Sequence, residues 1–223
     1  MRSDLARYDL FRDPFWLVEN LFKRYRVVYV PANAGWDPVN VAGSGSLYFG
    51  ANSHDVRTGT TANSSSGRIC IPVGLNRGDF TVGATDFSKK LIWLFGIFRV
   101  NSDPEAVAWL QLKNSTAMGD LAQTGIGVRV DNYAVTGEAY GSARGTLSLG
   151  TLTDKRVTRV KVVHIPGNRV EFWVNNVLIG SLTGTAVPTG APTCWLLHQI
   201  ENGATGGVNA TFGVCDIWFF QEW

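Results

Sequence analysis

The chain has 223 residues, 45% of them hydrophobic and 25 of them glycine, so it can bury a sizeable core and is neither disordered nor fibrous. Its formal net charge is only +2 and no segment concentrates Lys and Arg, which argues against a nucleic-acid partner. The longest uncharged apolar run, Leu91 to Phe98, is far shorter than the roughly 20 residues that span a bilayer, so we expect no membrane partner.

The N-terminal sequence does not predict a classical signal peptide, because no apolar segment is followed by a small-residue cleavage site. The three cysteines, Cys70, Cys194 and Cys215, lack the spacing of metal ligands. Cys194 and Cys215 can face each other on neighbouring late strands, although buried free thiols are favoured.

Residues 1–30 are predicted to form an N-terminal arm that differs from the rest of the chain. Asp13 followed by Pro14 is typical of a helix start, and we expect a helix over about residues 14–24. The side chains expected to form its apolar face and to mediate assembly are Phe15, Trp16, Val18, Leu21, Phe22 and Tyr25. Two uses stay open: the arm docks on a partner subunit, or it lies on its own sandwich.

Residues 31–223 are predicted to form one β-sandwich domain. A short strand at 27–30 precedes it, and residues 31–76 are expected to be long Gly/Ser-rich loops with brief strands at 46–49 and 68–71. Further strands are predicted at 80–87, 90–100, 106–112, 125–130, 146–149, 193–200 and 208–222. Strands at intervals near ten residues, separated by turns, are typical of a two-sheet antiparallel sandwich.

Residues 157–183 give the clearest structural prediction, a three-stranded antiparallel meander. Apolar and polar residues alternate on both sides of the turn at 166–168, as a half-buried strand requires. Asn175 and Asn176 form the second predicted turn, because Asn tolerates the positive φ angles of two-residue hairpin loops.

Four segments resemble the concanavalin A-like lectin/glucanase superfamily, which includes laminin G-like domains. They are residues 127–132 (GVRVDN), 156–162 (RVTRVKV), 168–180 (NRVEFWVNNVLIG) and 215–220 (CDIWFF). The resemblance covers about residues 80–223, and Asn176 stands where the turn glycine of the superfamily usually falls. It implies an all-β, two-sheet antiparallel jelly-roll sandwich, to which the N-terminal α-helix is added. The fold hosts lectins, glycosidases, laminin-type modules and virion proteins, so it does not select an activity.

The catalytic pattern of this superfamily is missing from the sequence. Its retaining glycosidases carry two glutamates and an aspartate on one strand, and no Glu-x-Asp-x-x-Glu string occurs here. The glutamates Glu105, Glu138, Glu171 and Glu201 are isolated and are predicted to be solvated or to lie in turns. We therefore predict no enzyme, with an atypical glycoside hydrolase as the weaker alternative.

No metal or cofactor site is predicted. His54, His164 and His198 are scattered without a zinc-binding pattern, and His198 is expected to be structural rather than to face a groove. Asp120 and the pair Asp131-Asn132 offer oxygen ligands, as in superfamily members that bind calcium, but no calcium loop motif is present. Turn chemistry explains these residues.

Trp109, Gln111 and Arg129 are the candidate residues for binding a glycan or a partner. On the strand 106–112, Trp109 and Gln111 have the parity opposite to Ala108, Leu110 and Leu112, and Arg129 alternates in the same way on the next strand. An aromatic ring with planar hydrogen-bonding groups suits pyranose recognition, and the superfamily binds glycans on the concave face of this sheet. The alternative is that loops or the N-terminal helix cover this face and bury Trp109.

The main functional prediction is a non-enzymatic structural or adhesion protein, such as a capsid decoration or fibre component at a virion surface. It rests on a similarity in style to structural proteins of tailed phages: few cysteines and a Gly/Ser-rich front half. We expect assembly through the N-terminal arm into a homo-oligomer or larger viral assembly, at the virion surface or outside the cell. The alternative is a lectin-like module that binds a cell-surface glycan on the concave face.

Overall fold

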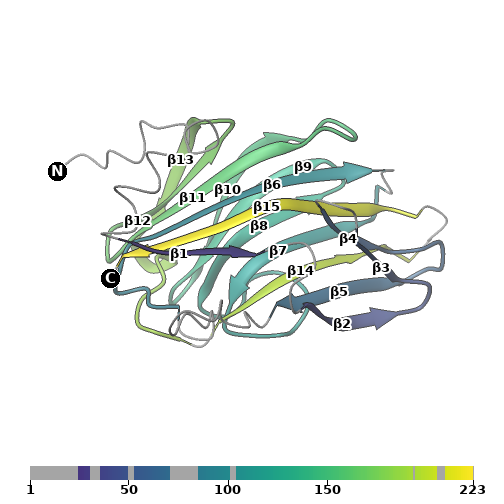
Figure 1. The fold of residues 1–223 in the computed structure, drawn as a ribbon, viewed down its shortest axis with the longest axis horizontal. Helices are drawn as coiled ribbons and strands as arrows, with labels where there is room; N and C mark the ends of the chain where they lie inside the picture. Colours follow the sequence, from purple (N-terminus) through teal and green to yellow (C-terminus); the bar gives the residue numbers. More distant parts are fainter. Residues whose placement is uncertain are drawn as a thin grey trace.

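The computed structural model describes residues 25–30, 36–49, 53–70, 85–100, 104–192, 194–204 and 209–222. Their strands form two antiparallel sheets that pack face to face, which confirms the predicted all-β sandwich (Figure 1). The helix predicted over residues 14–24 lies outside the described residues, and so does most of its expected assembly face. Helical structure in the described residues is limited to a short 3-10 turn, η4 (Gly184–Ala186). None of the described segments is a helix with the length and hydrophobicity to cross a membrane.

Sheet A contains eight strands. In spatial order they are β13 (Val177–Thr183), β12 (Arg169–Val174), β11 (Thr158–Ile165), β6 (Leu91–Val100), β15 (Thr211–Glu222), β4 (His54–Arg57) and β3 (Ser46–Phe49), with β1 (Tyr25–Val30) also paired to β15. The first half of β15 pairs with β4 and the second half with β1. Residues 25–30 are therefore part of the sheet.

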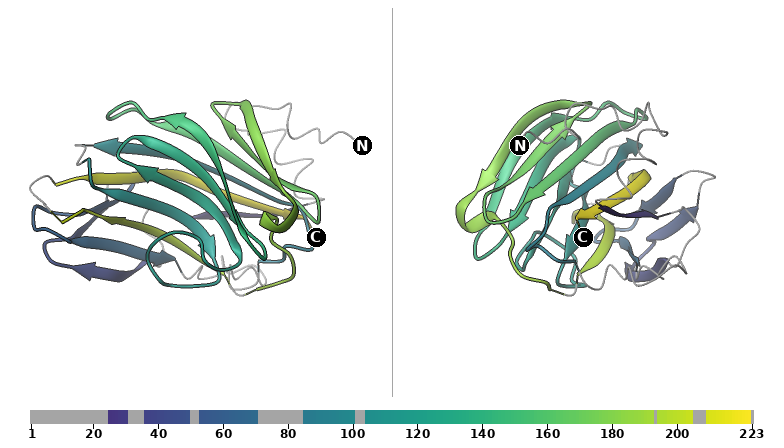
Figure 2. Two further views of the ribbon diagram at one scale, coloured as in Figure 1. Left: turned by 180° about the vertical axis from the view of Figure 1, so that it is seen from behind. Right: turned by 60° about the vertical axis from the view of Figure 1, so that its left-hand side comes forward.

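Sheet B contains seven strands. In spatial order they are β10 (Arg144–Thr151), β9 (Ala134–Tyr140), β8 (Gly125–Asp131), β7 (Val107–Lys113), β14 (Trp195–Glu201), β5 (Ser65–Cys70) and β2 (Trp36–Ala42). When the molecule is seen from behind, sheet B lies in front of sheet A (Figure 2, left). The face of sheet B that points away from sheet A is thus an outer surface of the sandwich.

The predicted meander is confirmed as β11, β12 and β13, which pair in sequence. Asn175 and Asn176 have φ angles of 47° and 68°, as the predicted two-residue turn requires. Glu171 points outward and accepts a hydrogen bond from Arg169, as its parity predicts. On the same outer side, the Lys161 ammonium lies 3.8 Å from the Trp173 ring centroid.

Four parts of the strand prediction were wrong. The predicted loops at 31–76 include the strands β2 and β4, the strand β9 was missed, and residues 85–87 form no strand. β2 lies at a sheet edge, where its proline is tolerated because no further strand needs the missing N–H. The segment at 85–87 instead closes one end of the sandwich: Phe87 N–H donates to Gly190 O at 2.7 Å, and Gln221 Nε2 donates to Asp86 O at 2.8 Å.

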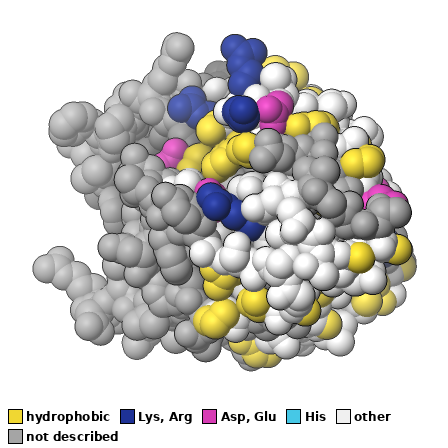
Figure 3. Space-filling view, turned by 90° about the vertical axis from the view of Figure 1, so that its right-hand side faces the viewer, with side chains coloured by type: hydrophobic (Ala, Val, Ile, Leu, Met, Phe, Trp, Pro, Cys, Tyr) yellow, Lys and Arg dark blue, Asp and Glu magenta, His cyan; other side chains and the backbone are white. Residues whose placement is uncertain are grey.

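At the opposite end, loops that connect strands of one sheet to strands of the other are joined by uncharged side chains. Ser64 Oγ donates to Thr61 O at 2.6 Å and accepts from Ser44 N–H at 3.1 Å, while Asn202 Nδ2 donates to Thr61 O at 2.8 Å. In Figure 3, which faces this end, uncharged polar side chains and backbone form most of the surface that is not grey. The polar loops here bind one another.

The apolar core fills the space between the sheets, and one charged side chain crosses it. Arg99 lies on the core side of β6 and is completely buried. Its guanidinium donates to Ala106 O at 3.0 Å and to Val130 O at 3.4 Å. Arg99 thus links sheet A to the backbone beside β7 and on β8, because buried guanidinium N–H groups need acceptors.

The two sheets approach closely where Gly137 of β9 faces Phe172 of β12. A Cβ atom at Gly137 would lie 2.7 Å from the Phe172 ring, which is fully buried. A glycine at this position leaves room for the ring.

We therefore expect Gly137→Ala to lower the free energy of unfolding by about 1–3 kcal/mol through overpacking. Urea denaturation checks this, with Gly180→Ala as the matched control, because that methyl would meet only the Leu147 side chain at 3.1 Å. Adding Phe172→Leu to Gly137→Ala should restore part of the loss beyond additivity. Equal losses for the two alanine variants would contradict the steric explanation.

Candidate functional site

The outer face of sheet B carries a dense group of polar side chains. On β7, Ala108, Leu110 and Leu112 enter the core, so Trp109, Gln111 and Lys113 lie on the opposite face. We call this surface the polar face. Its charged and amide side chains from the five adjacent strands are Gln111, Lys113, Arg129, Asp131, Glu138, Arg144, Gln199 and Glu201.

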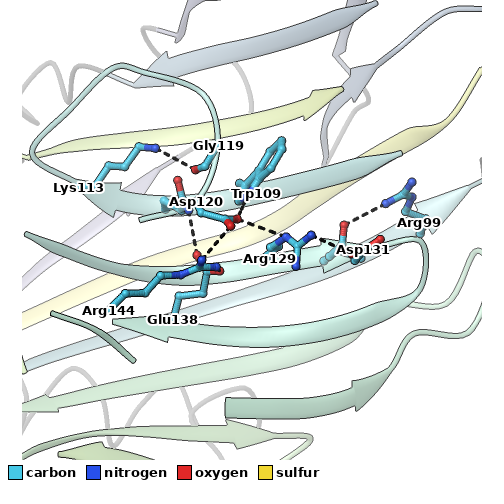
Figure 4. A network of polar contacts seen from close by, with 11 residues as sticks. Arg99, Trp109, Lys113, Gly119, Asp120, Arg129, Asp131, Glu138 and Arg144 are labelled. Atoms are coloured by element: carbon cyan, nitrogen blue, oxygen red, sulfur yellow. Dashed lines mark hydrogen bonds and ion pairs between the residues drawn. The ribbon is translucent and has the colours of Figure 1, made fainter. Parts of the chain in front are cut away.

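The connection between β7 and β8, residues 114–124, contacts the polar face through Asp120 (Figure 4). One carboxylate oxygen, Oδ1, accepts a hydrogen bond from Trp109 Nε1 at 3.1 Å and lies 3.3 Å from Arg129 Nε. The other, Oδ2, accepts from Arg144 Nη1 at 2.8 Å. Asp120 therefore joins donors from three different strands of sheet B.

A buried ion pair lies beneath Asp120. Glu138 has no exposed side-chain surface, and its Oε1 forms a short ion pair with Arg144 Nη2. Its Oε2 accepts from Gln111 Nε2 at 3.1 Å. Burial disfavours the charged guanidinium, but hydrogen bonding and charge from Glu138 and Asp120 outweigh burial and raise the pKa of Arg144.

Arg129 has two carboxylate partners. Besides Asp120, it donates from Nη2 to Asp131 Oδ2 at 2.8 Å. Arg129 and Arg144 keep 29% and 31% of their side chains exposed, whereas the Asp120 side chain is 42% exposed. The cluster is thus accessible at its top and closed at its base.

The structure brings Trp109, Gln111 and Arg129 to one face, with Trp109 opposite Arg129 in the β7–β8 register. Trp109 is only 3% exposed and Gln111 is fully buried, which agrees with the alternative in which a loop covers this face. The Trp109 ring is not an open stacking surface. A binding role for the three residues stays a prediction.

Glu138 was wrongly predicted to be solvated or in a turn. It lies on β9, a strand that the sequence pattern did not reveal, and its charge is compensated by Arg144. The sequence analysis also did not identify Lys113 and Arg144 as members of this cluster, and it assigned Asp120 only to turn chemistry. A possible signal was the identical parity of Gln111 and Lys113 on β7, which puts an amide and a cation beside Trp109.

Lys113 is 2% exposed, and its ammonium donates to Gly119 O at 3.2 Å, which ties the 114–124 connection to β7. Burial lowers the pKa of Lys113 to about 8, although Glu138 and Asp120 favour its charged form. On the other side of β7, burial and the negative charge of Asp120 raise the pKa of Glu201. Both shifts reflect the poor solvation of this face.

Gln199 of β14 lies opposite Trp109 and is fully buried. Its amide nitrogen and amide oxygen have no hydrogen-bond partner in the structure, and the same holds for Gln111 Oε1. Buried amides are nearly always paired, because an unmade hydrogen bond costs about 1–3 kcal/mol. These buried atoms therefore have unmet hydrogen-bonding capacity.

The described part of the chain holds no group of three or more His, Cys, Asp or Glu side chains arranged for a metal ion. Asn132 has a φ angle of 53° and lies in the β8–β9 turn, in keeping with a turn role. His198 is buried on the core side, with its ring 5.0 Å from that of Phe212, which confirms a structural position. Cys194 and Cys215 are free thiols, and burial raises their pKa values to about 12 and about 11.

No protein-family model matches the sequence, and no curated protein matches it either. Solved structures do match the fold. The carbohydrate recognition domain of Emp47p aligns with a TM-score of 0.57 at 11% identity, over 89% of this chain and 97% of that one. The β-glucanase of Bacillus licheniformis aligns with a TM-score of 0.57 at 10% identity, over 88% and 97%.

A third match is the protein of unknown function SO2946 from Shewanella oneidensis MR-1, with a TM-score of 0.56 at 15% identity over 89% of this chain and 87% of that one. The chain has the concanavalin A-like lectin/glucanase fold. At these identities the likeness concerns the fold, which is shared by carbohydrate recognition domains and by glucanases.

Removing the partner of a buried charge should be costly. We expect Arg144→Gln to lower the free energy of unfolding by about 1–3 kcal/mol, because Glu138 is left buried without its cation. Urea denaturation at pH 7 measures this, with the exposed Arg156→Gln as the control. Adding Glu138→Gln should recover part of the stability; a double variant as unstable as the sum of its parts would contradict the pairing.

Lys113 should make stability depend on pH. Its pKa of about 8 in the folded chain lies below the ordinary value of 10.5, so between these values the unfolded chain binds more protons. The contribution of Lys113 to the free energy of unfolding therefore increases as the pH rises from about 8 to about 10.5. The difference in unfolding free energy between wild type and Lys113→Met should change over that window; a constant difference would mean that Lys113 titrates normally.

Proposed function

We propose that this chain is a non-enzymatic carbohydrate-binding protein that binds glycans on the polar face of sheet B. The observation that carries the proposal is the cluster around Asp120, in which Trp109 of β7, Arg129 of β8 and Arg144 of β10 converge on a carboxylate that is 42% exposed. Planar guanidinium and amide groups can hydrogen-bond the closely spaced hydroxyl groups of a pyranose. The fold likeness to the Emp47p carbohydrate recognition domain supports this choice.

The unpartnered amides add to this support. Gln199 and the Oε1 atom of Gln111 are buried next to Trp109, and hydroxyl groups both donate and accept hydrogen bonds. A sugar hydroxyl that reached them from the polar face would satisfy them. Specific sites of this kind combine an apolar wall with a few placed polar groups.

The virion-surface function is less well supported. It rests on style of sequence and on an N-terminal arm of which residues 1–24 lie outside the described residues, and none of the three matched structures named above is described as a viral protein. Assembly through residues 14–25, a homo-oligomeric state and a location at a virion surface or outside the cell stay predictions.

A hydrolase is not our proposal, although a β-glucanase shares the fold. The residues that β7 presents on the polar face are Val107, Trp109, Gln111 and Lys113, and none is a carboxylate. The buried Glu138 is engaged by Arg144 and Gln111. A retaining glycosidase needs a nucleophile and an acid flanking the bond to be cleaved.

We expect the wild-type protein to bind a subset of glycans on an array, and Arg129→Gln to lose most of this binding. Arg129 is partly exposed and its replacement leaves the buried Glu138–Arg144 pair in place. Arg156→Gln, which removes an exposed cation elsewhere, should bind like wild type. A silent array for the wild-type protein, or equal binding by both variants, would overturn the proposed site.

A further inference from the structure

We propose that the glycans bound on the polar face carry a carboxylate, and that this group takes the position that Asp120 holds in the structure. The inference rests on the proposed function and names its ligand class: an acidic pyranose, either a uronic acid or a sialic acid. Asp120 is then an internal competitor supplied by the 114–124 connection.

The donors around Asp120 match a carboxylate at both oxygens. Trp109 Nε1 donates to Oδ1 at 3.1 Å and Arg144 Nη1 donates to Oδ2 at 2.8 Å, while Arg129 Nε forms an ion pair with Oδ1 at 3.3 Å without a hydrogen bond. All three groups belong to strands of sheet B, so they stay in place when the Asp120 side chain turns away. Hydrogen bonds between ionised groups are about twice as strong as neutral ones, which gives a ligand carboxylate a large share of its affinity here.

The charges in the cluster also call for a carboxylate at this point. Lys113, Arg129 and Arg144 supply three positive charges, and Asp120, Asp131 and Glu138 supply three negative ones. Asp131 and Glu138 are part of the sheet and each pairs with one arginine. When Asp120 leaves, Asp131 and Glu138 still balance the two arginines, so the one uncompensated positive charge in the cluster belongs to Lys113. Glu201 is a further carboxylate on this face, but β14 lies on the other side of β7 from both arginines.

A second, independent feature shows where the sugar ring would lie. The fully buried amide of Gln199 is unpartnered at both atoms, and it sits on β14 directly opposite Trp109. Gln111 Oε1, also unpartnered, is two residues along β7. A ring whose carboxylate replaces that of Asp120 places hydroxyl groups toward these amides across Trp109.

The Asp120 side chain is 42% exposed, so it can turn toward solvent while the connection on either side of it stays in place. Lys113 holds Gly119 O, Leu121 is 2% exposed, and Asn114 N–H donates to Thr124 O at 2.9 Å at the base. Gly119, next to Asp120, has a φ of 108° and open space around it. With an internal competitor, the apparent affinity is the intrinsic affinity multiplied by the fraction of molecules in which the site is free.

The experiment measures binding by calorimetry with two acidic probes and their neutral counterparts: tri-galacturonate against its carboxyl-reduced form, and sialyllactose against lactose. We expect wild type to bind at least one acidic probe, and Asp120→Ala to bind it at least about tenfold more tightly because the competitor is gone. Asp120→Asn, which keeps the shape but lacks the charge, should lie between them. Whichever acidic probe binds distinguishes a uronic from a sialic acid.

Controls separate this inference from general effects of charge and folding. Asp216→Asn removes an exposed negative charge on sheet A and should leave affinity unchanged. Adding Arg129→Gln to Asp120→Ala should abolish the gain. The indole N–H resonance of Trp109, assigned with Trp109→Phe, should shift in Asp120→Asn even without ligand, because its acceptor changes.

Binding of neutral and acidic probes with equal affinity would overturn the inference while leaving the proposed function standing. Tight binding of a sulfated oligosaccharide by Asp120→Ala, equal to that of the acidic probes, would show a general anion site and also overturn it. Binding of no probe and of no glycan on the array would overturn both.

Discussion

Both faces of β7 are buried, and this constraint shapes the whole of sheet B. One face packs in the apolar core, while the other lies beneath the 114–124 connection, so Trp109, Gln111 and Lys113 must find partners within the protein. The connection meets this demand with a backbone carbonyl at Gly119 and a carboxylate at Asp120. Glu138 and Arg144 meet it from the neighbouring strands. Gln199 and one atom of Gln111 remain unsatisfied, and these atoms mark where polar groups are still needed.

The cluster also explains how sheet B tolerates charged groups at its centre. A guanidinium that is held between two carboxylates loses less by leaving water than an unpaired one, and Arg129 and Arg144 each have two such partners. On the core side, the buried Arg99 guanidinium donates instead to backbone carbonyls. The sandwich therefore holds arginines at two depths. Arg99 joins the sheets through hydrogen bonds to backbone carbonyls, and Arg129 and Arg144 link the strands of the outer face through ion pairs.

The sequence predicted those parts of the fold in which alternation decides burial. The meander follows the rule because Val160, Val162 and Val170 enter the core while Glu171 and Trp173 stay outside. β9 breaks the rule: its core positions include Gly137, a residue without a side chain because Phe172 fills the space, and its polar face buries a charge at Glu138. A pattern of apolar and polar residues reveals such a strand poorly, because Gly137 interrupts its core side between Val135 and Ala139 and Glu138 is buried on its outer side.

The candidate site was predictable only in part, for a similar physical reason. Parity puts Trp109, Gln111 and Arg129 on one face, since parity depends on the strand alone. The covering of that face depends on the path of the 114–124 connection, which tertiary contacts such as Lys113 to Gly119 determine. Asp120, four residues from the end of its connection, carries no local signal that it will meet two arginines from β8 and β10.

Function on this fold is decided by what the polar face presents. The same sandwich serves a carbohydrate recognition domain and a β-glucanase, so the scaffold is compatible with binding alone and with hydrolysis. Hydrolysis needs carboxylates free to donate a proton and to attack, whereas Glu138 is locked by Arg144 and Gln111, and Asp131 by Arg129. Asp120 is the carboxylate in this cluster that comes from a connection rather than from a strand. The neutralisation of Glu138 and Asp131 therefore supports the proposed binding of an anionic group over hydrolysis at this cluster.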